Sequence, residues 1–297
     1  MRTCPFVTVD VFTDRRFGGN PLAVFPDATG LSDAEMQALA AEFNLSETTF
    51  VLPPADFAHT ARVRIFNRTA EMPFAGHPNV GTAFVLAQQG RGRDGVLLFE
   101  EIAGLVRISV ERDSTGVVRG ATIAAPQPLS LGPTLPPAIV APCAGLRTAD
   151  ILTTTHQPVQ ASVGNPFVIA EVSPPALGRA APDLAAFRDA LARNPALNDR
   201  YALYLYARDP QGTTIRARMF APLAGTWEDP ATGSAATPLA ALLLSFTQDE
   251  RGRFEIHQGI EMGRPSVLRT TAERTPEGIR ATVAGNCVEV LRGEALL

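Results

Sequence analysis

The sequence contains no lysine, because all 26 of its basic side chains are arginines. A pyridoxal phosphate enzyme needs a lysine for its Schiff base, and a P-loop needs the lysine of GxxxxGK. Both classes of protein are therefore excluded. The guanidinium of arginine has a pKa above about 12, which makes it a poor general base. Proton transfer in this protein must rest on Glu, Asp, His, Cys or Tyr.

Cysteine and histidine are also scarce. Cys4, Cys143 and Cys287 lie far apart in the chain and form no CxxC motif. The four histidines show no HExxH or similar ligand spacing. We therefore expect neither a disulfide framework nor a metal centre.

Long apolar runs and a strong charge of one sign are missing as well. No apolar stretch approaches the roughly 20 residues that span a bilayer, and the first residues, MRTCPFVTVDVF, lack the pattern of a signal peptide. The formal net charge of −4 argues against a surface that binds nucleic acid. We expect a cytoplasmic protein with neither membrane nor nucleic acid as a partner. Its 297 residues, 45% of them hydrophobic, suffice for one large domain or two smaller ones.

Two patterns occur twice along the chain, in the same order. FGGNPLAVF (17–25) and SVGNPFVIA (162–170) each place Gly-Asn-Pro before an apolar strand. Later, an arginine-containing strand, an acidic stretch, a small-residue turn and an apolar helix follow one another within 63–87 and again within 217–243. The offsets are 145 residues at the first pattern and 154 at the second. This order indicates a duplication; the alternative is that both patterns are common turn chemistry.

The expected secondary structure fits two halves of class α+β. Antiparallel meanders wrapped around one central helix per half agree with the pattern better than βαβ winding. We predict an N-terminal half at 1–125, to which the last strand of the chain could return, and a C-terminal half at 126–297. The proline-rich segment 125–137 is the expected linker. The N-terminal half is expected to hold strands at 5–12, 21–25, 48–53, 61–66, 95–101 and 105–112, and a helix from the capping box at Ser32 to Phe43.

The segment GRGRDG (90–95) matches the GxGxxG pattern of dinucleotide-binding proteins. It follows a predicted helix and precedes a predicted strand, which is the reverse of the context that dinucleotide binding requires. We interpret it as a charged turn.

A first candidate for proton chemistry lies in NLSETTFVLP (44–53), where Glu47 stands between a helix end and an apolar strand. Most glutamates at such a junction are simply solvated. If Phe50 and Val51 enclose this one, desolvation raises its pKa towards neutrality, as a general acid and base requires.

Two further candidates lie at small-residue helix starts. In AGHPNVGTA, Gly76 leaves room for a ligand at the backbone and His77 stands at the helix start. In EDPATGSAAT, Asp229 precedes Gly233 and Ser234. The ordinary alternatives are a turn histidine and an aspartate that caps a helix. If the two halves face one another, the unpaired N–H groups of both helix starts would converge on one small carboxylate.

In combination, DVFTDRRFGGNPLAVF, NLSETTFV, EMPFAGHPNVGTA and EDPATGSAA resemble the PhzF-like isomerases of phenazine biosynthesis, which share the fold of diaminopimelate epimerase and proline racemase. The resemblance runs from Val9 to beyond Ala240. It implies two pseudo-symmetric halves, each a β-barrel-like sheet around a central helix, with the active site between them. It also implies a homodimer, a small carboxylic acid as substrate, and neither a metal nor an organic cofactor.

The resemblance also implies residue roles. In the phenazine enzyme, a glutamate of the SETTF-like motif moves a proton during isomerisation of trans-2,3-dihydro-3-hydroxyanthranilate. Carried over motif by motif, the catalytic residues would be Glu47, His77 and Asp229, and the substrate-binding residues Gly76, Gly233 and Ser234.

The chain departs from the neighbouring epimerases in one respect. Those enzymes use two cysteines, one at each helix start, and neither AGHPN nor DPATG contains a cysteine. A two-thiol racemase is therefore disfavoured, and a mechanism with Glu47 as the single base is favoured. We predict a cofactor-independent isomerase of a small cyclic carboxylic acid. The alternatives are an epimerase or dehydratase of a hydroxy amino acid, and a non-catalytic protein that binds a small acid.

Overall fold

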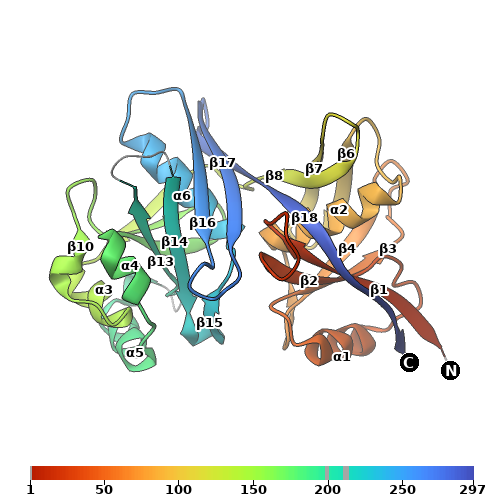
Figure 1. Cartoon of the computed structure of the whole chain (residues 1–297), viewed down its shortest axis with the longest axis horizontal. Helices are drawn as coiled ribbons and strands as arrows, with labels where there is room; N and C mark the ends of the chain where they lie inside the picture. Colours follow the sequence, from red (N-terminus) through yellow and green to blue (C-terminus); the bar gives the residue numbers. More distant parts are fainter. Residues whose placement is uncertain (1, 198–200, 210–213) are drawn as a thin grey trace. The chain divides into compact units, whose positions relative to one another are not determined.

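The computed structural model describes residues 2–197, 201–209 and 214–297. The chain forms two compact units (Figure 1): unit 1 comprises residues 1–124 and 284–297, and unit 2 comprises residues 125–283. The last strand, β18 (Gly278–Leu296), begins in unit 2 and ends in unit 1. Strands predominate and helices are few, so the fold is α+β, as the sequence predicts.

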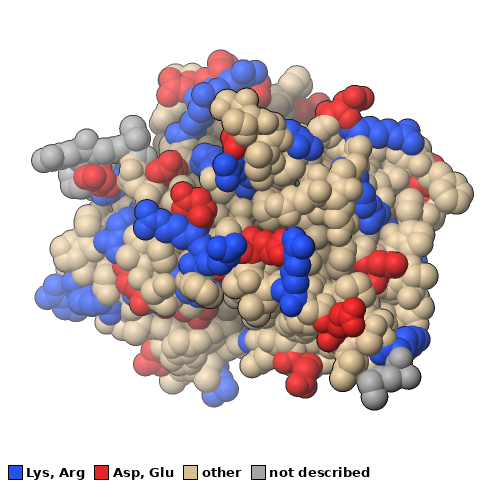
Figure 2. All heavy atoms as spheres, turned by 45° about the vertical axis from the view of Figure 1, so that its right-hand side comes forward, with Lys and Arg blue, Asp and Glu red and all other residues tan. Residues whose placement is uncertain are grey.

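Arginines and acidic side chains are interspersed on the face of the molecule that Figure 2 shows. This distribution agrees with the small net charge. Within the described part of the chain, no helix is long and apolar enough to cross a membrane.

Unit 1 is a closed barrel of eight strands. Its pairings run from β1 through β2, β3, β4, β6, β7 and β8 to β18, and β18 pairs again with β1. The pairs β2–β3 and β4–β6 are parallel, whereas β1–β2, β3–β4, β6–β7, β7–β8 and β1–β18 are antiparallel. The strands are β1 (Thr3–Val11), β2 (Asn20–Phe25), β3 (Thr48–Leu52), β4 (Ala61–Phe66), the short β5 (Glu71–Met72), β6 (Val96–Glu101), β7 (Gly104–Arg112) and β8 (Val118–Ala124).

The helix α2 (Gly76–Gln88) is buried along almost its whole length. It carries no charged residue and packs against β1, β2, β3, β7 and β8, as expected for a helix that is apolar all round. Gly81 is needed for this contact, because a Cβ there would lie 2.6 Å from the side chain of Leu22. The barrel therefore surrounds its central helix closely.

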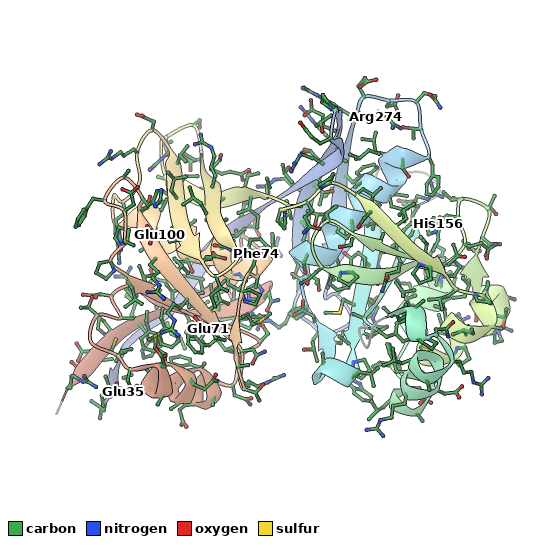
Figure 3. The ribbon with its side chains drawn as sticks, turned by 180° about the vertical axis from the view of Figure 1, so that it is seen from behind. Glu35, Glu71, Phe74, Glu100, His156 and Arg274 are labelled. Carbon is green, nitrogen blue, oxygen red and sulfur yellow. The ribbon has the colours of Figure 1, made fainter. Side chains whose placement is uncertain are left out.

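A second helix, α1 (Asp33–Phe43), packs on another side of unit 1. Ser32 and Glu35 form the predicted capping box at its first turn, where Figure 3 labels Glu35. Its Met36 belongs to an apolar cluster that includes the stacked rings of Phe25 and Phe50, with centroids 4.8 Å apart. This cluster anchors the start of β3.

Unit 2 repeats the arrangement. Its strands pair in the order β9, β11, β12, β13, β14, β16 and β17, with β12–β13 and β14–β16 parallel. The start of β18 accepts backbone hydrogen bonds from Ala125 and Leu129, which lead into β9. The strands are β9 (Ser130–Thr134), β10 (Ile151–Leu152), β11 (Val159–Ser162), β12 (Pro166–Val172), β13 (Leu203–Arg208), β14 (Thr214–Ala221), β15 (Thr226–Asp229), β16 (Arg251–Gln258) and β17 (Ser266–Thr275).

The central helix of unit 2 is α6 (Gly233–Ser245), which is buried against β11, β12, β16 and β17. The shorter helices contribute to a separate apolar core around Phe187 and Leu203. They are α3 (Pro137–Cys143), α4 (Pro174–Arg179) and α5 (Leu184–Arg193), with 3-10 turns at Thr148–Asp150, Pro195–Leu197 and Pro222–Ala224.

The two units share register as well as order. Thr48 of β3 pairs with Ala23 and Phe66 in unit 1, and Leu203 of β13 pairs with Val168 and Phe220 in unit 2. The prediction of two pseudo-symmetric halves is therefore confirmed. The proline-rich segment 125–137 contains strand β9, and GRGRDG forms a turn.

Candidate active site

Glu47 lies in the short loop between α1 and β3. The helix ends at Asn44, which adopts a left-handed φ of 52°, and β3 starts directly after Glu47. Only 16% of the Glu47 side chain is exposed. Burial raises the pKa of this carboxyl, and the Ser46 hydroxyl and the charge of Arg68 oppose the rise. The local environment is thus the desolvated one that a general acid and base requires.

His77 is the second residue of α2 and is 6% exposed. Its Nε2 lies 3.5 Å from Oε2 of Glu47, and its Nδ1 lies 3.4 Å from the side-chain amide nitrogen of Asn20. An amide nitrogen can only donate, so Nδ1 accepts and the proton of a neutral ring is on Nε2, facing Glu47. The structure thereby brings two of the predicted catalytic residues together.

Asn20 connects His77 to the loop that carries Glu47. Its Oδ1 accepts a hydrogen bond of 3.4 Å from the hydroxyl of Ser46, the neighbour of Glu47. Asn20 follows Gly19, whose φ is +62° and whose added Cβ would lie 2.4 Å from the Val11 carbonyl oxygen. Only glycine fits there without strain, and the turn fixes where the amide lies.

Gly76 is the first residue of α2 and is buried. The preceding residue, Ala75, cannot cap the helix with its methyl group. In the described part of the chain, no side chain caps this helix start. Backbone N–H groups at such a helix start favour an anion. The third predicted residue of unit 1 is thus at the same end of α2 as His77.

Unit 2 brings Asp229, Gly233 and Ser234 together at the start of α6. Asp229 ends β15 and is 8% exposed, and its Oδ2 accepts a hydrogen bond of 2.5 Å from the Thr232 hydroxyl. Gly233 is buried and Ser234 is partly exposed. As at α2, the residue before the helix makes no side-chain cap with the described part of the chain.

Gln258 organises this turn. Its amide nitrogen donates to the Asp229 carbonyl oxygen at 2.7 Å and to the Thr232 hydroxyl at 2.9 Å. Its amide oxygen accepts from the Thr232 N–H and from the hydroxyl of Tyr204, whose pKa is raised by burial. The next residue, Gly259, has a φ of +74°, and a Cβ there would lie 2.6 Å from the Pro230 carbonyl oxygen. Gln258 and its buried partners therefore hold the turn in one conformation.

Sequence reasoning missed the residues that hold the predicted site residues of each unit in place. Asn20 and Ser46 lie in motifs whose local pattern predicts only a turn and a loop. Gln258 gives no local signal, because its partners Asp229 and Thr232 are distant in the chain.

The cysteines are not among the predicted site residues of either unit: Cys4, Cys143 and Cys287 are buried and free. Burial raises the pKa of the Cys143 thiol to about 11. Among the described residues, no group of three or more His, Cys, Asp and Glu side chains is placed to hold a metal ion.

Comparison with known proteins identifies the family and the fold. The model of the phenazine biosynthesis-like protein family matches residues 9–293. The trans-2,3-dihydro-3-hydroxyanthranilate isomerase of Pseudomonas chlororaphis is 36% identical over 98% of this chain and 99% of its own. The PhzF-family phenazine biosynthesis protein of Bacillus anthracis has a TM-score of 0.88 and 26% identity, with both chains covered completely.

A more distant structure shares the fold alone. The hydroxyproline epimerase of Agrobacterium vitis has a TM-score of 0.64 at 13% identity, with 100% of this chain and 93% of its own covered. The fold and the relatives therefore define an isomerase built from two epimerase-like halves. The chain belongs to the phenazine biosynthesis-like, or PhzF, family.

Proposed function

We propose that this isomerase moves a proton on a small cyclic carboxylic acid, with Glu47 as general acid and base and with neither a metal nor an organic cofactor. The observation that carries the proposal is the buried Glu47 carboxyl, 3.5 Å from the His77 ring and with a raised pKa. A carboxyl whose pKa is raised above its ordinary value is better suited both to take and to return a proton. The named substrate of the Pseudomonas relative, a cyclic carboxylic acid, supports the substrate class.

In the proposed reaction the Glu47 carboxylate takes a proton from one carbon of the substrate, and that C–H bond breaks. The electron pair of the bond enters the conjugated system of the substrate. Glu47, now neutral, returns the proton to another carbon and becomes a carboxylate again. The Nε2–H of His77 would hold the carboxylate in position. General acid and base catalysis of this kind accelerates a reaction by roughly 10²–10⁴-fold.

We propose binding roles for the helix starts. The backbone N–H of Gly76 in unit 1 would bind a substrate carboxylate, since helix N-termini favour anions. For unit 2 we propose that Gly233 and Ser234 bind the substrate and that Asp229 takes part in the proton chemistry. The short contact of Asp229 with Thr232 would keep its carboxylate oriented.

The test is deuterium uptake from heavy water, followed by NMR. The substrates would be trans-2,3-dihydro-3-hydroxyanthranilate and a panel of cyclic and amino-acid carboxylates. Wild type would be compared with Glu47→Gln and with Glu42→Gln, a matched control that changes an exposed glutamate at the end of α1. We expect isomerisation with solvent exchange in wild type and in the Glu42 variant, and its loss in the Glu47 variant.

Other outcomes would point elsewhere. Uptake that survives in the Glu47 variant would overturn Glu47 as the base. Deuterium confined to a stereocentre, or loss of water, would indicate the epimerase or dehydratase of a hydroxy amino acid. Tight binding without exchange, unchanged in the Glu47 variant, would indicate the non-catalytic binding protein.

The homodimer that the resemblance implies and the cytoplasmic location expected from the sequence stay predictions. Size-exclusion chromatography with light scattering would test the first, and cell fractionation the second.

A further inference from the structure

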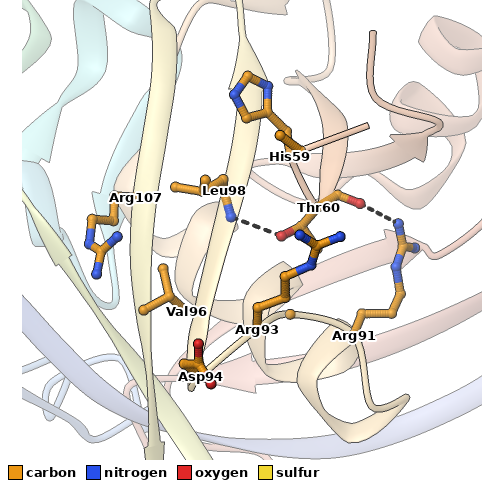
Figure 4. Close-up of a pocket in the computed structure, with 10 residues that line it drawn as sticks. His59, Thr60, Arg91, Arg93, Asp94, Val96, Leu98 and Arg107 are labelled. Carbon is orange, nitrogen blue, oxygen red and sulfur yellow. Dashed lines mark hydrogen bonds between the residues drawn. The ribbon is translucent and has the colours of Figure 1, made fainter. Parts of the chain in front are cut away.

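A pocket lies in unit 1, and neither Glu47 nor His77 lines it. The pocket has a volume of about 420 Å³ (Figure 4) and lies between the turn that follows α2 and the strands β6 and β7. Arg91 and Arg93 of the GRGRDG turn line it, together with Arg107 of β7. None of the residues assigned to the candidate active site lines this pocket.

The turn is held by its own backbone. Arg91 N donates to the Leu86 carbonyl oxygen at 3.0 Å, and Arg93 and Val96 exchange backbone hydrogen bonds of 3.0 and 2.8 Å. Gly92 has a φ of +101°, and a Cβ there would lie 2.9 Å from the Val96 carbonyl oxygen. The turn therefore presents Arg91 and Arg93 from a fixed backbone.

The charges in the pocket do not cancel. Arg91 is half-buried, donates to the Thr60 carbonyl oxygen at 2.9 Å and interacts with the charge of Asp27, whereas Arg93 and Arg107 line the pocket from the turn and from β7. Three arginines and one acidic residue, Asp94, line the pocket, and Asp27 outside the lining acts on Arg91 through its charge. Nδ1 of His59, which also lines the pocket, lies 2.8 Å from Oε1 of Glu100.

We propose that this pocket binds a small phosphomonoester. The guanidinium groups of Arg93 and Arg107 offer positive charge in the lining, and guanidinium groups bind phosphate oxygens in a bidentate manner. The side chains of Val96 and Leu98 complete the wall and offer an apolar surface for the organic part of the ligand. A volume of about 420 Å³ lies within the range of small-molecule sites. The site is independent of the proposed isomerase reaction.

The test uses phenyl phosphate as the probe, with inorganic phosphate and benzenesulfonate for comparison. Binding to the full chain would be followed by NMR shifts of the arginine Nε–Hε groups. We expect saturable shifts at the pocket arginines, with phenyl phosphate bound more tightly than inorganic phosphate or the singly charged sulfonate. Each lost charge-assisted hydrogen bond is worth about tenfold in affinity, so Arg93→Gln and Arg107→Gln should each raise the Kd about tenfold. The matched control is Arg253→Gln, which changes an exposed strand arginine of unit 2 and should leave the Kd unchanged.

A second variant makes an opposite prediction. Asp94 has a left-handed φ of 51°, which asparagine also tolerates, so Asp94→Asn should keep the turn. Removing this negative charge should lower the Kd of phenyl phosphate about threefold, as one weakened charge interaction would. Shifts that do not saturate, a Kd that Arg93→Gln and Arg107→Gln leave unchanged, or weaker binding by Asp94→Asn would each overturn the proposal.

Discussion

The two units build the same framework with the same side chains. In unit 1, Arg64 of β4 forms a bidentate pair with Glu71 of β5 and stacks over Phe66 at 5.1 Å. In unit 2, Arg218 of β14 forms the same pair with Glu228 of β15 and stacks over Phe220 at 5.0 Å. The sequence repeat of these strands is thus a repeat of one structural device, which attaches the short strand before each central helix.

The chemistry at the equivalent positions differs. Since β3 and β13 correspond by register, Ala202 stands before β13 where Glu47 stands before β3. Helices α2 and α6 begin at Gly76 and Gly233, so Ser234 corresponds to His77. Duplication has therefore repeated the barrel and its helix but not the pair of Glu47 and His77. The two units share one scaffold, and the pair of Glu47 and His77 occurs in unit 1 alone among these equivalent positions.

The largest effect is expected at the equivalent pair His77 and Ser234. If His77 supports proton transfer by Glu47, His77→Gln should lower the exchange rate by about 10²–10⁴-fold. If Ser234 binds a charged substrate as proposed, Ser234→Ala would remove one hydrogen bond and should lower the rate about 10–100-fold. Single-turnover exchange in heavy water measures both. A larger loss at Ser234 than at His77 would place the proton chemistry in unit 2.

The next effect concerns the two arginine pairs. Arg218 is 7% exposed in its side chain and also donates to the carbonyl oxygens of Leu177 and Ala180. Removing one partner of such a buried pair costs about 3–5 kcal/mol, so Arg218→Ala should lower the free energy of unfolding by that amount. Arg64 shares its charge with the exposed Asp33, and Arg64→Ala should cost about 1–3 kcal/mol.

Urea denaturation followed by circular dichroism would compare these two variants. Arg253→Ala, at an exposed strand position, serves as the control and should stay within about 0.5 kcal/mol of wild type. Equal losses for Arg64 and Arg218 would contradict the difference in burial.

A third prediction contrasts two buried glutamates. Burial raises the pKa of Glu101 in unit 1 to about 8, from 4.5, whereas in unit 2 the pKa of Glu171 is lowered because its hydrogen bonds and its charge interaction with Arg208 outweigh burial. Between pH 4.5 and 8 the native state binds more protons at Glu101 than the unfolded state, so stability falls as pH rises. Between pH 5 and pH 8 the contribution of Glu101 to the free energy of unfolding falls by about 3 kcal/mol.

The measurement is the free energy of unfolding as a function of pH. Glu101→Gln should gain stability over wild type as pH rises through this window. Glu171 affects stability in the opposite direction. Its contribution to the free energy of unfolding is complete at neutral pH and is lost as pH falls through its lowered pKa. Glu171→Gln should therefore differ least from wild type in acid. A constant difference across pH for either variant would contradict its assignment.

The smallest effect is expected at the helices that connect equivalent strands. Ser32 caps α1 between β2 and β3, and Asp183 caps α5 between β12 and β13 by accepting from two backbone N–H groups. Each change to alanine should cost about 1 kcal/mol. Thermal unfolding of Ser32→Ala and Asp183→Ala would test this, and a clearly larger loss in one would show that its cap does more than end a helix.

Local patterns predicted much of the secondary structure. The capping box at Ser32 placed α1, and alternating apolar residues placed β3, β4 and β7 close to their observed bounds. The apolar stretch after the small-residue turn at Gly76 predicted a central helix, which the structure shows as α2. The closed barrel could not be read in this way, because its closure depends on β18 pairing with β1 and β8, strands far from it in the chain.

By itself, the sequence determined which chemistry is available and where the helices and strands begin, since both depend on residue types and short-range spacing. It excluded lysine chemistry, and its motifs indicated the PhzF family and the candidate residues Glu47 and His77. Only the tertiary structure decided that these two side chains lie 3.5 Å apart and that Asn20 and Gln258 hold the two turns. Those contacts join residues that are distant in the chain, and burial, which raises the pKa of Glu47, arises only when the strands and helices around it have packed.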